Sequence, residues 1–175
     1  MAQTASHGKL DHRARPMGCP AWAPSGDGPD ALYIRNVLLS TARRLLGDAR
    51  VGRLSTLTAD LRPHVVPCCF ALSADVVYSA VDAKPKSTLA LRRLENLRAH
   101  PQAALLVDHY DEDWTALWWI RVDGEGRIVD TAVEKERALG ILEAKYAQYR
   151  ALRPPGDVIA LEIERWRSWP ESDPP

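Results

Sequence analysis

The middle of the chain alternates short apolar segments with turn-forming residues and leaves almost no room for helices between them. Such segments run from Arg50 to Leu57, from His64 to Leu72 and from Asp75 to Ala80, separated by residues such as Asp60 and Pro63. A parallel sheet needs a crossover of a dozen or more residues, usually a helix, between successive strands. The sequence therefore predicts consecutive antiparallel strands.

The strand pattern returns after residue 100. Gln102 to Tyr110 has strand character, and Asp157 to Arg165 is a last strand. Between them, Trp118 to Val122 and Arg127 to Thr131 flank the sequence Asp-Gly-Glu-Gly at positions 123–126. Asp-Gly supplies the positive backbone dihedral angles of a tight turn, so we expect a hairpin there. Together these segments favour a mainly β fold, a small six-stranded antiparallel barrel.

Helical spacing of apolar residues marks three further segments, which we expect to flank the barrel. The first runs from Ala31 to Gly47, the second begins near Ser87, and the third runs from Val133 to Arg150.

Composition limits the class of protein. The 175 residues fit one domain, and 23 basic residues balance 23 acidic ones, so nothing draws the chain toward nucleic acid or an anionic membrane. An odd number of cysteines, three, favours a reducing compartment, and the expected location is the cytoplasm. Residues 1–30 are rich in proline and glycine and are predicted to be a disordered extension. Residues 31–170 would form the folded domain and residues 171–175 a disordered tail.

The segment DAKPKSTLALRRL, Asp82 to Leu94, places Lys84 and Lys86 just before a predicted helix for which Ser87 is a candidate N-cap. The start of a helix carries partial positive charge, so each lysine there is unfavourable by up to ~1 kcal/mol unless an anion binds. The five residues directly before Lys86, Val81 to Pro85, include no glycine, which excludes the phosphate-binding loop of nucleotide triphosphatases. A phosphate site and a solvated lysine pair remain as the two alternatives.

Other constellations of reactive residues point to no further chemistry. Cys68 and Cys69 are neighbours in a strand and face opposite sides, so we expect no metal site. No glycine-flanked serine indicates a covalent hydrolase. Trp114, Trp118 and Trp119 cluster beside an acidic loop, which is typical of core packing, a subunit contact or a surface that holds a flat ring system.

Several short motifs follow one another in a characteristic order. They are Arg53-Leu54-Ser55-Thr56, Arg62-Pro63-His64-Val65-Val66-Pro67, Lys84-Pro85-Lys86, and Asn96-Leu97 followed by His100-Pro101. From about Ala49 to Trp169 this order resembles the pyridoxamine 5′-phosphate oxidase-like split-barrel superfamily. The stretch VDHYDEDWTALWW from Val107 to Trp119 is similar to the actinobacterial branch that uses the deazaflavin coenzyme F420. One departure is the turn at residues 59–62, which lacks the Asp-Gly usual in this family.

The resemblance implies a homodimer of split barrels with the cofactor in a groove at the interface. Lys84 and Lys86 would bind the cofactor's phosphate, with Ser79 and Ser87 nearby. The backbone of three consecutive residues would pass along the ring system, and one tryptophan would approach from the partner subunit. These residues are Val66, Pro67, Cys68 and Trp114.

The expected function is that of an F420-dependent oxidoreductase, which transfers a hydride between reduced F420 and a small organic substrate. The alternatives are an oxidoreductase that uses flavin mononucleotide (FMN) and a non-catalytic F420 carrier or sensor. The cofactor carries the difficult chemistry in all such enzymes, so no catalytic acid or base is assigned. We expect no nucleic-acid or membrane partner.

Overall fold

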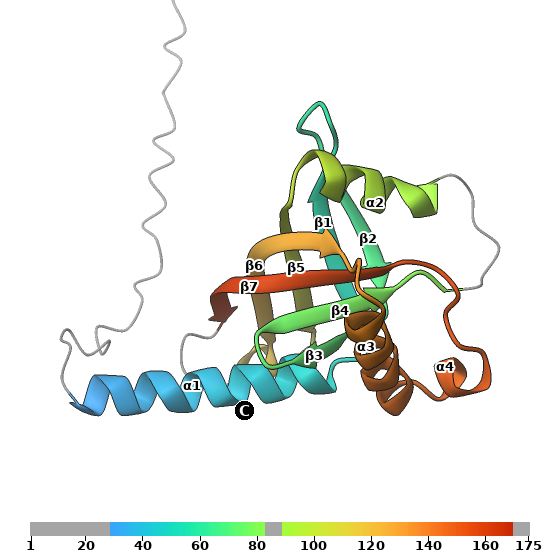
Figure 1. Cartoon of the computed structure of the whole chain (residues 1–175). Coiled ribbons are helices and arrows are strands. Elements are labelled where there is room, and N and C mark those ends of the chain that lie inside the picture. The colour runs from blue at the N-terminus through green and yellow to red at the C-terminus, as the bar shows by residue number, and fades with distance from the viewer. Residues whose placement is uncertain (1–28, 83–88, 170–175) are drawn as a thin grey trace, which may run out of the picture.

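Seven strands form one antiparallel sheet in the computed structural model, which describes residues 29–82 and 89–169. In chain order they are β1 (Gly52–Leu57), β2 (Pro63–Cys68), β3 (Ala71–Ser73), β4 (Val76–Ala80), β5 (Gln102–His109), β6 (Trp118–Ile128) and β7 (Val158–Trp169). Their order in the sheet is β2-β1-β5-β6-β7-β4-β3. The sheet curls until β7 and β4 cross the direction of β1 and β5 (Figure 1). The predicted antiparallel barrel with flanking helices is confirmed, with seven strands in place of six.

Helices cover the two ends and one side of this curled sheet (Figure 1). Their bounds are α1 (Pro29–Asp48), α2 (Leu89–Ala99), α3 (Ala132–Lys145) and α4 (Ala147–Ala151), with one 3₁₀ turn, η1 (Trp114–Ala116). The third predicted helix is divided, because Tyr146 takes an extended backbone with φ −118°. The disorder predicted for residues 1–30 and 171–175 falls outside the described residues, apart from Pro29 and Asp30, which open α1.

Two cores follow from the alternation of side chains along the strands. Inside the curl, Leu54, Leu105 and Val122 pack with Leu46 of α1 and Leu94 of α2, all buried. On the opposite face of β4 and β7, side chains of these strands pack against α3 and the residues that follow it in a second buried group. Its members include Tyr78, Ala138, Leu142, Tyr146, Tyr149 and Ala160. Consecutive residues of β4 therefore serve different cores, since neighbouring side chains of a strand point to opposite faces.

The hairpin predicted at Asp123-Gly124 is wrong, because β6 continues without a turn from Trp118 to Ile128. A register shift between Asp123 and Gly124 marks a β-bulge in the pairing with β7. A Cβ atom at Gly124 would lie 1.8 Å from the carbonyl oxygen of Glu162. Glycine is present here because the two backbones approach too closely for any side chain, which is its other common role in a strand.

The turn between β1 and β2 needs no glycine, as its sequence indicated. Leu61 adopts a left-handed backbone with φ 61°. The Thr58 hydroxyl accepts a hydrogen bond from Arg62 N at 2.9 Å, and Thr58 N donates to Arg62 O at 2.9 Å. These contacts hold a conformation that is unfavourable for a leucine.

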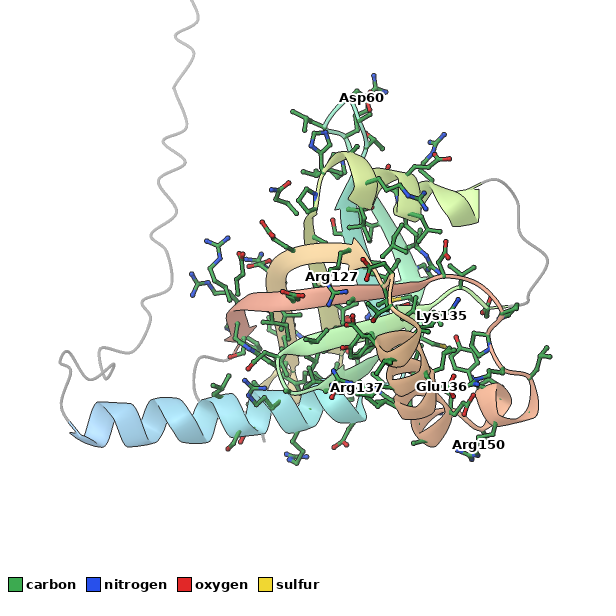
Figure 2. All side chains as sticks on the ribbon, in the orientation of Figure 1. Asp60, Arg127, Lys135, Glu136, Arg137 and Arg150 are labelled. Carbon is green, nitrogen blue, oxygen red and sulfur yellow. The ribbon has the colours of Figure 1, made fainter. Side chains whose placement is uncertain are left out.

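An ion-pair network fixes α3 to the sheet. Arg127, near the end of β6, donates to Glu162 of β7 at 2.9 Å and to both carboxylate oxygens of Glu134 in α3, at 2.8 and 3.0 Å. The hydroxyl of Tyr78 donates to Glu134 and accepts from Arg137, so the network links five side chains, two of which bond directly to the Glu134 carboxylate. Figure 2 labels Arg127 on the strands and Arg137 on α3. Hydrogen bonds from Arg127 hold the pKa of Glu134 below its usual value.

Replacing Gly124 with alanine is expected to destabilise the fold by more than about 2 kcal/mol, because a Cβ cannot be accommodated without separating β6 from β7. Gly140→Ala is the matched control, since nothing lies within 4 Å of a Cβ at Gly140 in α3. That change should stabilise the protein by about 0.5–1 kcal/mol. Urea unfolding of the two variants measures both effects, and equal stability would contradict the close approach.

Candidate functional site

Val66, Pro67 and Cys68 form the end of an edge strand. β2 pairs with β1 and, among the described strands, with no other. Val66 is half-buried, Pro67 is exposed and Cys68 is buried. The other side of β2 therefore leaves backbone groups that a planar ligand could use, next to a thiol that points into the barrel.

Ser79 lies across a gap in the sheet from this edge. The chain passes through Cys69 and Phe70 from one edge of the sheet to the other, where β3 and β4 lie. Ser79 of β4 is buried, and its Oγ donates to the Cys69 carbonyl oxygen at 2.9 Å. This hydrogen bond ties the end of β2 to β4 at the point where the barrel is split.

Lys84, Lys86 and Ser87 lie outside the described residues, in the segment 83–88 between β4 and α2. The described part of α2 adds a cation of its own, Arg93, which is half-buried. Burial raises the pKa of the Cys68 thiol, whereas a hydrogen bond with Ser79 and the charge of Arg93 oppose that rise. Cys68 of β2 and Ser79 of β4 thus lie close together, and the charge of Arg93 on α2 acts on the same thiol.

A buried polar contact positions α2 over the barrel. Asn96 Nδ2 donates to Thr56 Oγ1 at 2.9 Å, and both residues are almost fully buried. Thr56 Oγ1 also lies 3.4 Å from His64 Nδ1 on β2. Because an unsatisfied buried amide costs about 1–3 kcal/mol, this contact favours one placement of α2 relative to β1 and β2.

Tyr146 holds the corner between β2 and β3, a role that its place in a helical stripe did not reveal. Its hydroxyl accepts from Phe70 N at 3.0 Å and lies 2.8 Å from Phe70 O and 2.9 Å from Arg50 O. Burial raises the pKa of Tyr146 to about 12. A buried tyrosine hydroxyl usually finds a partner, so the signal available in the sequence was a tyrosine on the apolar face of a helix.

Lys145 packs on the same corner. Its Nζ lies 4.1 Å from the centroid of the Phe70 ring and is buried without a hydrogen-bond partner among the described residues. Burial, followed by the charge of Arg50, lowers the pKa of Lys145 to about 8. At this corner, the Lys145 ammonium group therefore packs against Phe70 and is poorly solvated at neutral pH.

Trp114 lies apart from these residues. It opens the turn η1, which Asp113 caps by accepting from Thr115 N at 2.9 Å, and its side chain is 71% exposed. Tyr110 in the same connection is 67% exposed. Among the described residues, no hydrogen bond or ring contact joins Trp114 to the end of β2 or to Ser79. The structure therefore brings together Val66, Pro67, Cys68 and Ser79 and leaves Trp114 free to contact another molecule.

Two further observations concern metal binding and membrane-spanning helices. Within residues 29–82 and 89–169, no three His, Cys, Asp or Glu side chains are grouped to hold a metal ion. No helix in that same part of the chain has the length and apolarity needed to cross a membrane.

Lys145→Met is expected to make the unfolding free energy less dependent on pH. The pKa of Lys145 is about 8 in the folded state and 10.5 in the unfolded state, so at pH values between these two the unfolded chain binds a proton that the folded chain does not. Lys145 therefore makes the free energy of unfolding rise with pH in this range. The difference between wild type and Lys145→Met should therefore shrink as the pH rises. At neutral pH the variant should be more stable by about 1 kcal/mol, since it buries no charge.

Denaturant unfolding at a series of pH values measures this difference. Lys135→Met on the same helix is the control, because Lys135 Nζ is not a buried unpaired atom. A difference independent of pH would show that Lys145 is solvated in the folded protein.

Comparison with solved structures shows the fold in other proteins. A conserved hypothetical protein of Mycobacterium tuberculosis is 18% identical, with a TM-score of 0.61 over 75% of this chain and 84% of that one. A FAD-binding protein of Mesorhizobium loti is 23% identical, with a TM-score of 0.55 over 75% of this chain and 90% of that one. The heme storage protein HutZ of Vibrio cholerae is 13% identical, with a TM-score of 0.57 over 77% and 93%. At these identities the likeness shows the fold alone.

No curated protein matches the sequence. The family model described as pyridoxamine 5′-phosphate oxidase matches residues 38–170, which include every strand of the sheet and the gap between β2 and β4. The chain therefore belongs to the pyridoxamine 5′-phosphate oxidase family.

Proposed function

We propose that this protein is an oxidoreductase that holds the deazaflavin F420 in the groove beside β2 and reduces a small organic substrate. The observation that carries the proposal is the open edge of β2, which ends beside the hydrogen bond from Ser79 to the Cys69 carbonyl. Arg93 of α2 is close enough for its charge to act on the Cys68 thiol. An edge strand can contact a planar ring through its backbone, and the cation can meet a phosphate. The resemblance of Val107 to Trp119 to the F420-dependent branch supports the deazaflavin.

The bound cofactor would supply the hydride, and the protein's residues would supply binding, orientation and exclusion of water. Val66, Pro67 and Cys68 would lie along the ring system. Lys84, Lys86 and Ser87 would bind the phosphate, as the charge argument from the sequence predicts, with Ser79 beneath them. The bound phosphate would then offset the unfavourable placement of these lysines at the start of a helix.

FMN is the second candidate cofactor. Its tricyclic ring and phosphate would use the same groups, and the FAD-binding protein of Mesorhizobium loti has the same fold. A third candidate function is that of a carrier or sensor that binds F420 without turning over a substrate.

A homodimer would complete the groove, and the outer face of the sheet supports this arrangement. A row of side chains crosses five strands on this face, from Val65 through Ser55, Ala104 and Asp123 to Arg165. The row contains a negatively charged side chain, Asp123, and a positively charged one, Arg165, and it borders a hollow of about 470 Å³. Val65 is 58% exposed. A two-fold interface needs a surface that is complementary to itself, which apolar residues together with both charges provide. Trp114 of the partner subunit would then reach the cofactor.

Titration with F420 and with FMN, followed by cofactor fluorescence, tests the proposal. We expect saturable binding of F420 that is tighter than that of FMN. Replacing both Lys84 and Lys86 with alanine should weaken binding about tenfold or more, because each charge-assisted phosphate contact contributes ~1.5–3 kcal/mol. Tighter binding of FMN would favour the second candidate, and absence of binding to either would contradict the proposed site.

Anaerobic mixing of the reduced F420 complex with a panel of acceptors separates an enzyme from a carrier. Oxidation of the cofactor in the presence of one acceptor, followed by its absorbance, is the expected result. A complex that stays reduced with every acceptor would favour the carrier.

Val65→Lys is expected to convert a dimer into a monomer, because it places a cation at an exposed apolar position that the two-fold interface would bury. Val133→Lys on α3 is the control, since Val133 is 83% exposed and belongs neither to this row of side chains nor to the lining of the hollow. Light scattering after size-exclusion chromatography gives the mass of each. A wild-type protein with the mass of one chain would contradict the homodimer.

A further inference from the structure

Cys69 is the more accessible of two adjacent thiols, and its surroundings differ from those of Cys68. Cys68 is buried in the inner core, whereas Cys69 is half-buried and packs against the second core beside α3. Neighbouring side chains of an extended chain point to opposite faces, which accounts for this difference. Cys69 therefore faces α3 and not the inside of the barrel.

The end of α3 brings polar groups to the corner that carries Cys69. Cys69 lies near enough for its charge to act on Lys145, the last residue of α3. The Tyr149 hydroxyl forms a hydrogen bond with Cys69, which adds to the rise that burial causes in the pKa of Tyr149. The guanidinium carbon of Arg50 lies 4.6 Å from the centroid of the Tyr146 ring. Two cations and a phenol hydroxyl are therefore gathered at this corner.

Lys145 has hydrogen-bonding capacity that the fold leaves unused. An ammonium group has three donors and no acceptor, and the Lys145 Nζ is buried without a partner among the described residues. Phe70, which follows Cys69 in the chain, offers it only the face of a ring at 4.1 Å. Buried polar atoms are nearly always hydrogen-bonded, so the corner lacks an acceptor. The Cys69 thiol is a weak acceptor, and an oxygen bonded to its sulfur would be a better one.

The two thiols differ in the properties that govern oxidation. Reactive cysteines lie in electropositive, partly exposed surroundings, whereas buried structural cysteines are inert. Cys69 is partly exposed and lies beside Lys145, while Cys68 is buried, and burial raises the pKa of its thiol. Oxidation of a thiol by a peroxide first gives a sulfenic acid, which thiol reductants reverse.

We propose that Cys69 is a site of reversible oxidation by peroxides and that the oxygen of its sulfenic acid accepts a hydrogen bond from Lys145. The deprotonated sulfur attacks one oxygen of hydrogen peroxide, so that an S–O bond forms and the O–O bond breaks. The sulfur loses two electrons, and the other peroxide oxygen leaves as hydroxide. This hydroxide combines with the proton that the thiol has lost and becomes water. The site is separate from the proposed cofactor groove and does not depend on the proposed function.

Trapping of the sulfenic acid with dimedone, followed by peptide mass spectrometry, tests the proposal. Cys19→Ser is introduced into every protein, so that only Cys68 and Cys69 can react. The reaction is run at neutral pH, below the pKa of Lys145 of about 8, which keeps the ammonium form. Hydrogen peroxide should label Cys69 about tenfold or more faster than Cys68. Cys69→Ser should abolish the label, and dithiothreitol added before dimedone should prevent it.

Replacement of Lys145 tests the part played by its ammonium group. Lys145→Met should slow the labelling of Cys69 about tenfold, because a charge-assisted hydrogen bond is lost. Lys145→Arg keeps a cation and its donors at the corner, so it should retain most of the rate. Lys135→Met is the matched control and should react like wild type, since Lys135 lies about 15 Å earlier along the same helix.

Three results would overturn the inference. The first is labelling of Cys68 as fast as that of Cys69, or no labelling of Cys69. The second is an unchanged rate in Lys145→Met. The third is an equal loss of rate in Lys145→Met and Lys145→Arg, which would mean that only the packing of the lysine stem matters. Tyr149→Phe removes the hydroxyl that is bonded to Cys69 and should also slow labelling. It serves in place of Lys145→Met if that variant does not fold, and an unchanged rate would then overturn the inference.

Discussion

The close approach of β6 and β7 is the constraint on which the rest of the barrel depends. β6 pairs with β5 on one side and with β7 on the other, so it belongs to both halves of the sheet. The bulge at Asp123 and Gly124 lets the two pairings take different directions, because a bulge bends a strand and increases its twist. Without that bend, β4 and β7 could not turn across β1 and β5, and the inner core around Leu105 and Val122 would lose one wall.

Closure on the other side depends on a single corner of the chain. Between Cys68 and Ala71 the backbone leaves one edge of the sheet and joins the other, so strand pairing cannot satisfy its polar groups. The Tyr146 hydroxyl accepts a hydrogen bond from Phe70 N, and the Ser79 hydroxyl donates one to the Cys69 carbonyl. Both contacts come from elements outside β2, and the side of β2 away from β1 pairs with no described strand. The split in the barrel is thus stabilised by side chains and not by strand pairing.

The sequence predicted the architecture better than the details of the site. Alternation and the scarcity of intervening helices were enough for an antiparallel barrel, because both are local signals. Gly124 was misinterpreted because a turn glycine and a close-approach glycine look alike until the partner, Glu162, is known. Tyr146 was not recognised for a similar reason, since its role comes from contacts with Arg50 and Phe70, which are distant in sequence. The interpretation of Val66, Pro67 and Cys68 as cofactor-binding residues came from family resemblance, and spacing alone would not have indicated them.

Two prolines in β2 have a consequence for solubility. An unpaired edge strand is a surface on which another chain could add a strand. Pro63 and Pro67 occupy positions of the same parity as Val65, so their missing N–H groups belong to one side of the strand. Prolines are tolerated in a sheet where that side is open, and on it only Val65 keeps a donor. The edge therefore keeps its carbonyl acceptors but lacks the repeating donors that a misfolded neighbour would need to pair with it.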